Sequence, residues 1–221
     1  QLERQITEIL KAASSIAFVC ASAQNIDRIV TLFRACVQSG RKLLVDPYAG
    51  HLLREMNGFS SRLPFPSPAF SKSLGVYYPR NLCRRMRIRL NAGHILDDFD
   101  SLRVWPAAIG LSPEKYLLLV RDSMVKDLER ELGFAADNAL LLYSLWEGYW
   151  NAGSMPNLQS WANTHQMDFR YTHTSGHADP IALRRLADAL SPRQIIPIHT
   201  SHAQNYADYF SQPISLANDG I

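Results

Sequence analysis

The sequence contains only three cysteines, Cys20, Cys36 and Cys83, and no CxxC pair. Such a small, odd and widely spaced set excludes a disulfide framework or a zinc ribbon, and favours buried thiols in a reducing compartment. No apolar run approaches the length of a membrane span, and no signal peptide is visible. We therefore expect a cytoplasmic protein without a membrane partner.

The sequence also lacks internal repeats, low-complexity segments and an excess of either charge sign. The first two absences exclude solenoid and disordered classes. The 23 Lys and Arg residues against 20 Asp and Glu residues give a net charge of +3, which is compatible with a polyanionic partner but does not demonstrate one. A length of 221 residues allows one large domain or two smaller ones with a real core.

Short continuous apolar runs alternate with helical periodicity in the first part of the chain, which is typical of an α/β fold with a buried parallel sheet. Strands are predicted in SSIAFVCA, KLLVD, YLLLV and ALLLYSLW. Helices are predicted at the N-terminus, between Ile26 and the stop glycine Gly40, in YAGHLLREM and in VKDLERELG. Because the first crossover is a βαβ unit, it should be right-handed.

The region between residues 57 and 112 is harder to interpret. Asn57–Pro79 carries four prolines and several serines and predicts a surface excursion, and the next residues predict a helix with five arginines. Those arginines are either a phosphate-binding face or, as is commoner, a solvated face over an inward side formed by Leu82, Met86 and Leu90. The fold of residues 57–112 is not predicted.

The last fifty residues predict a strand at 168–173, a tight loop, a helix from Asp179 to Pro192, a strand at 195–198 and a closing helix at 203–210. The first helix carries an apolar stripe of Ile181, Leu183, Leu186, Ala187 and Leu190. Four of the seven histidines fall between positions 173 and 202. They follow predicted strand ends, where α/β folds place their chemistry.

The residue types in this region suggest a site. His177 could act as a general acid, because an imidazole titrates near working pH. His199 follows a strand, as a metal ligand held by a rigid element would. A single histidine after a strand is more often a hydrogen-bonding residue, but His173, the Ser-Gly turn and His177 together make coincidence less plausible. His202 could line the same cleft.

The remaining three histidines, His51, His94 and His165, lie in helix or loop contexts without companions. We interpret them as structural.

HTSGHA, followed by a helix and then PIH, resembles the closing segment of the β-CASP metallo-β-lactamase-fold nucleases, such as ribonuclease J and the mRNA 3′-end cleavage endonucleases. His177 matches the motif B histidine and His199 the motif C histidine. SAQNIDRIVTLFRACVQSGRKLLVD resembles the opening of the β-CASP insert, and LLYSLWEGY resembles its later strand, whose serine, Ser144 here, faces the substrate phosphate.

The resemblance implies a Rossmann-like β-CASP domain over residues 1–170, with a parallel sheet flanked by helices. Residues 171–221 would be a returning strand-helix-strand piece of the metallo-β-lactamase αββα fold. It also implies zinc-dependent phosphodiester hydrolysis, with two zinc ions in the intact protein and RNA favoured over DNA. His177 would serve the leaving group and His199 one metal. The expected phosphate-binding and cleft-lining residues are His173, Ser175, Ser144, Ser22, Gln24 and Asn25.

The departures from the family pattern are large. The H-x-H-x-D-H ligand motif and the acidic motif A residue are missing, His-Thr-Ser replaces the His-Gly-Glu that ribonuclease J-like proteins commonly have, and VRDSM is the nearest match to Gly-Ser-Gln-Gly-Glu. One ligand histidine cannot hold a catalytic zinc, which needs about three protein ligands. The chain also starts at Gln1 without a methionine.

We therefore expect a portion of a nuclease, inactive by itself, that lacks its N-terminal partner half and exposes a sheet face that favours oligomerisation. The alternatives are a non-catalytic nucleotide- or phosphate-binding module and a pseudoenzyme subunit that pairs with an active homologue.

Overall fold

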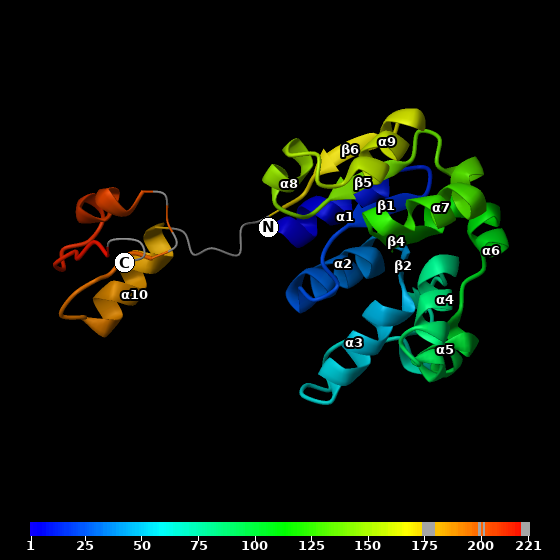
Figure 1. Cartoon of the computed structure of the whole chain (residues 1–221), viewed down its shortest axis with the longest axis horizontal. Helices are drawn as coiled ribbons and strands as arrows, with labels where there is room; N and C mark the ends of the chain where they lie inside the picture. Colours follow the sequence, from blue (N-terminus) through cyan, green and yellow to red (C-terminus); the bar gives the residue numbers. More distant parts are fainter. Residues whose placement is uncertain (174–179, 199, 201, 218–221) are drawn as a thin grey trace. The chain divides into compact units, whose positions relative to one another are not determined.

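The computed structural model describes residues 1–173, 180–198, 200 and 202–217. The chain divides into two compact units, Gln1–Thr174 and Ser175–Ile221, which are described separately (Figure 1). The sequence-based boundary lay between residues 170 and 171. Ser175, His177 and His199 lie outside the described residues.

Unit 1 is built on one six-stranded parallel sheet in the order β3-β2-β4-β1-β5-β6. The strands are β1 (Ala17–Cys20), β2 (Lys42–Val45), β3 (Leu74–Val76), β4 (Tyr116–Val120), β5 (Leu140–Tyr143) and β6 (Asp168–Tyr171). The three central strands are almost wholly buried, as the continuous apolar runs of β1, β4 and β5 require. The predicted α/β class with a parallel sheet flanked by helices is confirmed.

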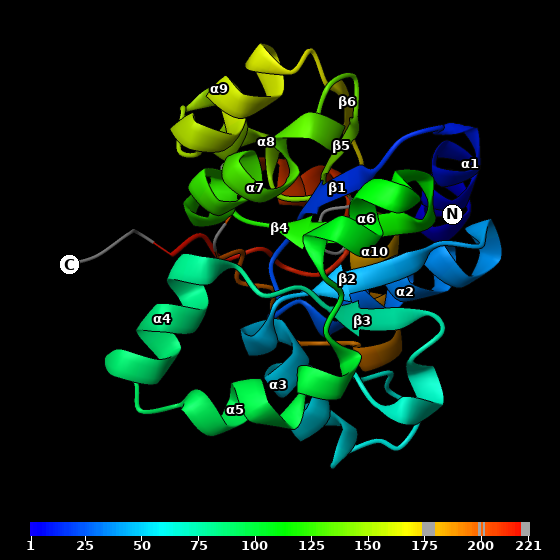
Figure 2. The same ribbon diagram turned by 90° about the vertical axis from the view of Figure 1, so that its right-hand side faces the viewer.

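Helices cover both faces of this sheet (Figures 1 and 2). They are α1 (Leu2–Ala12), α2 (Ile26–Ser39), α3 (Pro47–Asn57), α4 (Arg80–Ile88), α5 (Gly93–Asp98), α6 (Pro106–Leu111), α7 (Val125–Leu132), α8 (Glu147–Asn151) and α9 (Pro156–Thr164). Alternate residues of β1 enter different cores: Ala17 and Val19 pack with α1, α2 and α3, whereas Phe18 and Cys20 pack with α7 and α9. Helices on opposite faces follow from the period of two along each strand.

The ends of α2 match their sequence signals. The side chain of Asn25 caps the first turn by accepting a hydrogen bond from the Arg28 backbone nitrogen at 3.0 Å. Gly40 ends the helix with a φ of +73°, a left-handed conformation that glycine adopts without steric cost.

Residues 57–112, whose fold was not predicted, add an edge strand and three short helices to unit 1. A small core of its own holds this region, formed by Val76, Tyr78, Met86, Ile95, Leu96 and Phe99. Met86 is buried as predicted, but the prediction for Leu90 is wrong, because its side chain is 62 % exposed. The helix ends at Ile88, so the helical spacing that would turn Leu90 inward does not reach it.

Unit 2 contains α10 (Pro180–Leu190) and a 3₁₀ helix, η6 (Ala203–Asp208), where a closing helix was predicted. The strand predicted at 195–198 is wrong: Ile195 forms a single bridge to Ile214, and no other described residue of this stretch pairs. Pro197 lacks a backbone N–H, and a strand cannot persist without a neighbour to pair with. Among the described residues, no helix is both long and apolar enough to cross a membrane.

Candidate functional site

The carboxyl ends of β1 and β5 form a topological switch point in unit 1. The two strands are neighbours, yet the helices that follow them pack on opposite faces of the sheet: α2 contributes to one core and α9 to the other. Open α/β sheets bind ligands in the crevice outside such a point. Side chains from the loops after β1, β5 and β6 are therefore candidates for ligand binding.

Three predicted site residues lie on the exposed loop between β1 and α2. Ser22 Oγ accepts a hydrogen bond from the Gln24 backbone nitrogen at 3.3 Å, and Asn25 caps α2. The Gln24 side-chain amide donates to the Tyr48 hydroxyl at 3.3 Å, which ties this loop to the start of α3. Their polar groups are exposed to a ligand at the carboxyl end of β1.

A buried arginine ties the ends of β5 and β6 to α2. Arg28 Nη1 donates to Ser144 Oγ at 2.7 Å and to the Thr172 carbonyl oxygen at 2.9 Å, and Ser144 Oγ donates to the same carbonyl at 2.6 Å. Burial lowers the pKa of the Arg28 guanidinium, which nevertheless stays charged at neutral pH. Arg28 was not predicted as a site residue, although its place three residues after the Asn25 cap puts it in the first turn of α2.

Ser144 and His173 are brought together by this arrangement. Ser144 is almost fully buried, and its hydroxyl both donates and accepts, so the geometry favours a role in positioning. His173 comes directly after Thr172 in the chain and is half-buried. Its Nδ1 atom lies 3.4 Å from the Ser144 carbonyl oxygen. Its ring centroid lies 6.0 Å from that of Tyr171. The chain thus enters the histidine-containing loop from a fixed starting point.

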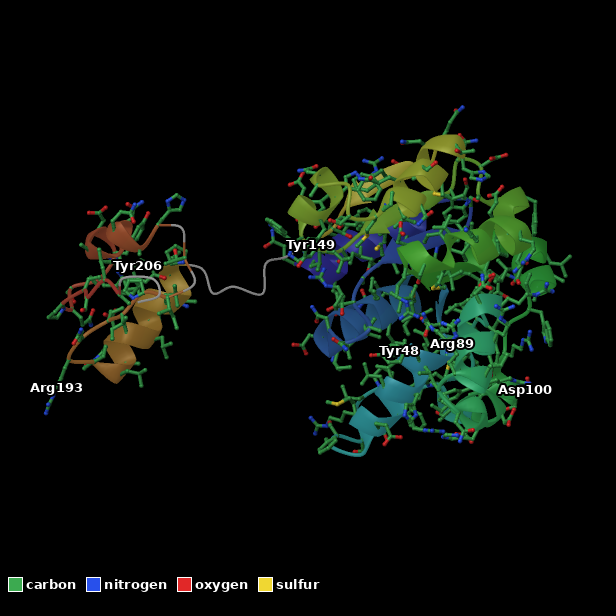
Figure 3. The ribbon with its side chains drawn as sticks, in the orientation of Figure 1. Tyr48, Arg89, Asp100, Tyr149, Arg193 and Tyr206 are labelled. Atoms are coloured by element: carbon green, nitrogen blue, oxygen red, sulfur yellow. The ribbon has the colours of Figure 1, made fainter. Side chains whose placement is uncertain are left out.

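A second polar group lies at the carboxyl ends of β2 and β4. Arg121, which follows β4, pairs with the buried Asp46 carboxylate, and its guanidinium lies 5.6 Å from the centre of the Tyr48 ring. Asp46 also accepts the Ala49 backbone N–H at 3.0 Å as the cap of α3. Tyr48, labelled in Figure 3, therefore joins this pair to the Gln24 loop.

Two of the histidines interpreted as structural, His51 and His165, have side-chain partners in the protein. His165 Nδ1 lies 2.6 Å from an Asp137 carboxylate oxygen, and Nε2 lies 2.7 Å from Glu129. Burial lowers the pKa of His165, but the hydrogen bonds to Asp137 and Glu129 outweigh it and leave that pKa raised. His51 Nδ1 lies 3.1 Å from an Arg54 guanidinium nitrogen.

The described part of the chain does not supply the set of zinc ligands that the resemblance implies. There, no group of three or more His, Cys, Asp or Glu side chains is placed to hold a metal ion. Cys20 and Cys36 are buried, and burial raises the pKa of both thiols, to about 12 for Cys20, which disfavours the thiolate form that binds metals. His202 is exposed, and the described residues form no such cluster around it. The described donors therefore do not fit a zinc site.

The C-terminal segment matches a known protein family. Residues 166–215 match the family described as "Zn-dependent metallo-hydrolase RNA specificity domain". This match supports the resemblance to the metallo-β-lactamase/β-CASP family. It also indicates zinc as the metal and RNA as the ligand of that family.

Comparison with solved structures shows the fold. The chain is similar, with a TM-score of 0.67 and 15% identity, to a protein of unknown function from Enterococcus faecalis V583. The similarity covers 100% of this chain and 44% of that one, so the chain spans less than half the length of its relative. No curated protein matched the sequence. The segment that carries the histidine motifs is thus similar to an RNA specificity domain of zinc-dependent metallo-hydrolases.

Proposed function

We propose that this chain is the RNA-binding portion of a zinc-dependent phosphodiester hydrolase of the β-CASP type, resembling ribonuclease J. The observation that carries the proposal is the family match over residues 166–215, because it falls on the segment that contains the HTSGHA and PIH motifs. The polar residues at the carboxyl ends of β1, β5 and β6 also support it, since the Arg28–Ser144–Thr172 network holds His173 there.

Each predicted residue has a proposed task in the intact enzyme. Ser22, Gln24 and Asn25, exposed on the β1–α2 loop, line the path of the nucleic acid and donate to its phosphates. His173 and Ser175 hold a phosphate next to the scissile one, and Ser144 fixes the position of His173.

His177 is proposed to serve the leaving group and His199 to be one metal ligand. The remaining ligands would come from a segment that this sequence does not contain. By itself the chain is expected to bind RNA without cleaving it.

The test compares this chain with the full product of its gene. End-labelled RNA is incubated with each protein in the presence of zinc, and binding and cleavage are followed on native and denaturing gels. The proposal predicts binding by both proteins and cleavage by the longer one alone. Zinc-dependent cleavage by the 221-residue chain would contradict the proposal that this chain binds RNA without cleaving it. The absence of RNA binding by both proteins would contradict the proposed RNA-binding function.

The two histidine roles can be separated in the longer protein. His177→Ala should abolish turnover and leave the zinc content unchanged, because His177 is proposed to act on substrate. His199→Ala should lose zinc as well as turnover. Equal zinc content in the two variants would refute the assignment.

We also propose that α10 makes the isolated chain self-associate. Within unit 2 its apolar stripe is largely uncovered, since Ile181, Leu186 and Leu190 are each more than half exposed. Exposed apolar faces of this kind drive association. Sedimentation velocity should show concentration-dependent oligomers that Leu186→Glu weakens. A stable monomer at high concentration would contradict this proposal.

A further inference from the structure

The strongest feature away from the carboxyl ends of β1, β5 and β6 is the arginine-rich outer face of α4. This face lines an open groove of about 410 Å³. The lining residues recur at helical spacing and are Asn81, Arg84, Arg85, Ile88 and Arg89. Arg89 is labelled at the end of the helix in Figure 3. The helix packs inward through Met86, helped by Leu82 and Cys83, so the arginines of the groove do not serve to cover the core.

The charges of this face are only partly balanced. Arg80 and Arg87 have carboxylate neighbours, Glu131 at 3.8 Å and Asp97 at 3.7 Å. In the described part of the chain, Arg84, Arg85 and Arg89 have no acidic group within ion-pair distance and are exposed. Three guanidinium groups attached along about 8 Å of helix axis make a row of positive charge.

Hydrogen bonds to α7 fix the position of α4 and of its arginine row. The Asp127 carboxylate, buried in α7, accepts the Asn81 backbone N–H at 2.7 Å and its side-chain amide at 3.1 Å. A negative charge at this place also favours the N-terminal end of α4. The orientation of the groove is therefore fixed relative to the sheet.

An aromatic platform adjoins the first residue of the helix. Arg80 lines a second cavity, of about 250 Å³, together with Arg103, Trp105 and Glu131. The Arg103 guanidinium lies 3.4 Å from the Trp105 ring centre and 4.7 Å from that of Tyr78. The Trp105 side chain is still 54% exposed, so one part of the stack is open to a ligand.

We infer that the α4 groove and the Trp105 platform together bind single-stranded RNA. Arginines that lack acidic partners neutralise phosphates, and an exposed aromatic next to them stacks on an unpaired base. A row of charge without the aromatic would suit any polyanion, whereas the pair suits a flexible strand with exposed bases. The choice of RNA rests on the proposed function; the location of the surface rests on α4 and Trp105 alone.

The test measures fluorescence anisotropy of a fluorescein-labelled oligouridylate with the whole 221-residue chain at several salt concentrations. The variant R84Q/R85Q/R89Q should lose about 100-fold in affinity at about 0.1 M salt, and its log–log salt slope should fall by about 2. R84K/R85K/R89K keeps the charges and should keep the slope. W105A should lose about 10-fold in affinity with an unchanged slope, because stacking is not ionic.

The matched control removes the same number of positive charges from the opposite face. R4Q/K11Q/R34Q changes exposed residues of α1 and α2, which lie away from α4 in both Figure 1 and Figure 2. Its affinity should fall by less than about 3-fold, because distant exposed charges are screened at this salt.

Binding by the wild-type chain with an equal loss in the α4 variant and the control would overturn the inference and leave the proposed function standing. Equal competition by an RNA duplex and the single strand would overturn the assignment to unpaired bases. No binding by the wild-type chain would overturn both the inference and the proposed function.

Discussion

Removing the Ser144 hydroxyl tests whether this residue positions the histidine loop or contacts phosphate directly. In the variant Ser144→Ala, Arg28 loses the 2.7 Å acceptor and the Thr172 carbonyl loses the 2.6 Å donor, but the 2.9 Å bond between Arg28 and Thr172 remains. A hydrogen bond to a charged group contributes about 1.5–3 kcal/mol and a neutral one about 1 kcal/mol. The two lost bonds correspond to about 2.5–4 kcal/mol, but the retained bond between Arg28 and Thr172 offsets part of the loss, so we expect the free energy of unfolding to fall by about 2 kcal/mol.

Tryptophan fluorescence during urea unfolding is the assay, because all four tryptophans, at positions 105, 146, 150 and 161, lie in unit 1. With a denaturant slope of about 2 kcal/mol/M, the midpoint should fall by about 1 M. The control Ser160→Ala, at an exposed position of α9, should change it little. A loss below about 0.5 kcal/mol in Ser144→Ala would refute the network as a stabilising element.

The same variant separates the two roles in RNA binding. If Ser144 acts only by positioning His173, Ser144→Ala should weaken RNA binding no further in a His173→Ala background, whereas a direct phosphate contact of Ser144 would be lost in both backgrounds. A further loss of affinity in the His173→Ala background would restore the direct contact that the resemblance implied for Ser144.

Three further predictions concern stability and reactivity in unit 1. The His165–Glu129 pair should stabilise the protein between the ordinary pKa values of the two groups, 4.5 and 6.5. Its contribution falls as pH rises through the raised pKa of His165, or drops through the lowered pKa of Glu129. His165→Gln should therefore cost most near about pH 5.5, on the order of 0.5–1 kcal/mol; a loss that does not vary with pH in melting curves would contradict this. Gly75→Ala should cost about 1–3 kcal/mol in urea unfolding, because the added Cβ would meet Val104 Cγ2 at 2.9 Å; an unchanged midpoint would refute the tight packing. Cys20, whose thiol pKa burial and Asp122 raise to about 12, should resist thiol reagents at about pH 8 until the protein unfolds; peptide mapping that finds it labelled in the native state would contradict this.

The buried sheet could be predicted from the sequence because apolar runs carry their own signal. YLLLV became β4 over the predicted residues, and SSIAFVCA contains β1. The prediction of a strand at 195–198 was wrong because a strand forms only beside a neighbouring strand with which it exchanges hydrogen bonds. The apolar pattern of a segment does not show whether such a neighbour is available. Residues 57–112 were not predictable because their small core joins short helices to an edge strand through contacts distant in sequence.

The candidate site was predictable in its loops but not in its connections. Ser22, Gln24 and Asn25 follow a predicted strand, and parallel strands bring their carboxyl ends to one edge. Nothing local links Arg28 to Ser144, which lies 116 positions further along the chain. The arginines of α4 were correctly seen as a helix face, but only the structure separates Arg84, Arg85 and Arg89 from those that have acidic neighbours.

The decisive measurement is the zinc content per chain, by plasma mass spectrometry on freshly purified protein never exposed to chelator. We propose that this chain supplies RNA-binding surface and His199 but not a complete metal site, and we therefore predict a zinc content near zero. One or more tightly held zinc ions per chain would contradict it, because the histidines between positions 173 and 202 would then form a metal centre of their own.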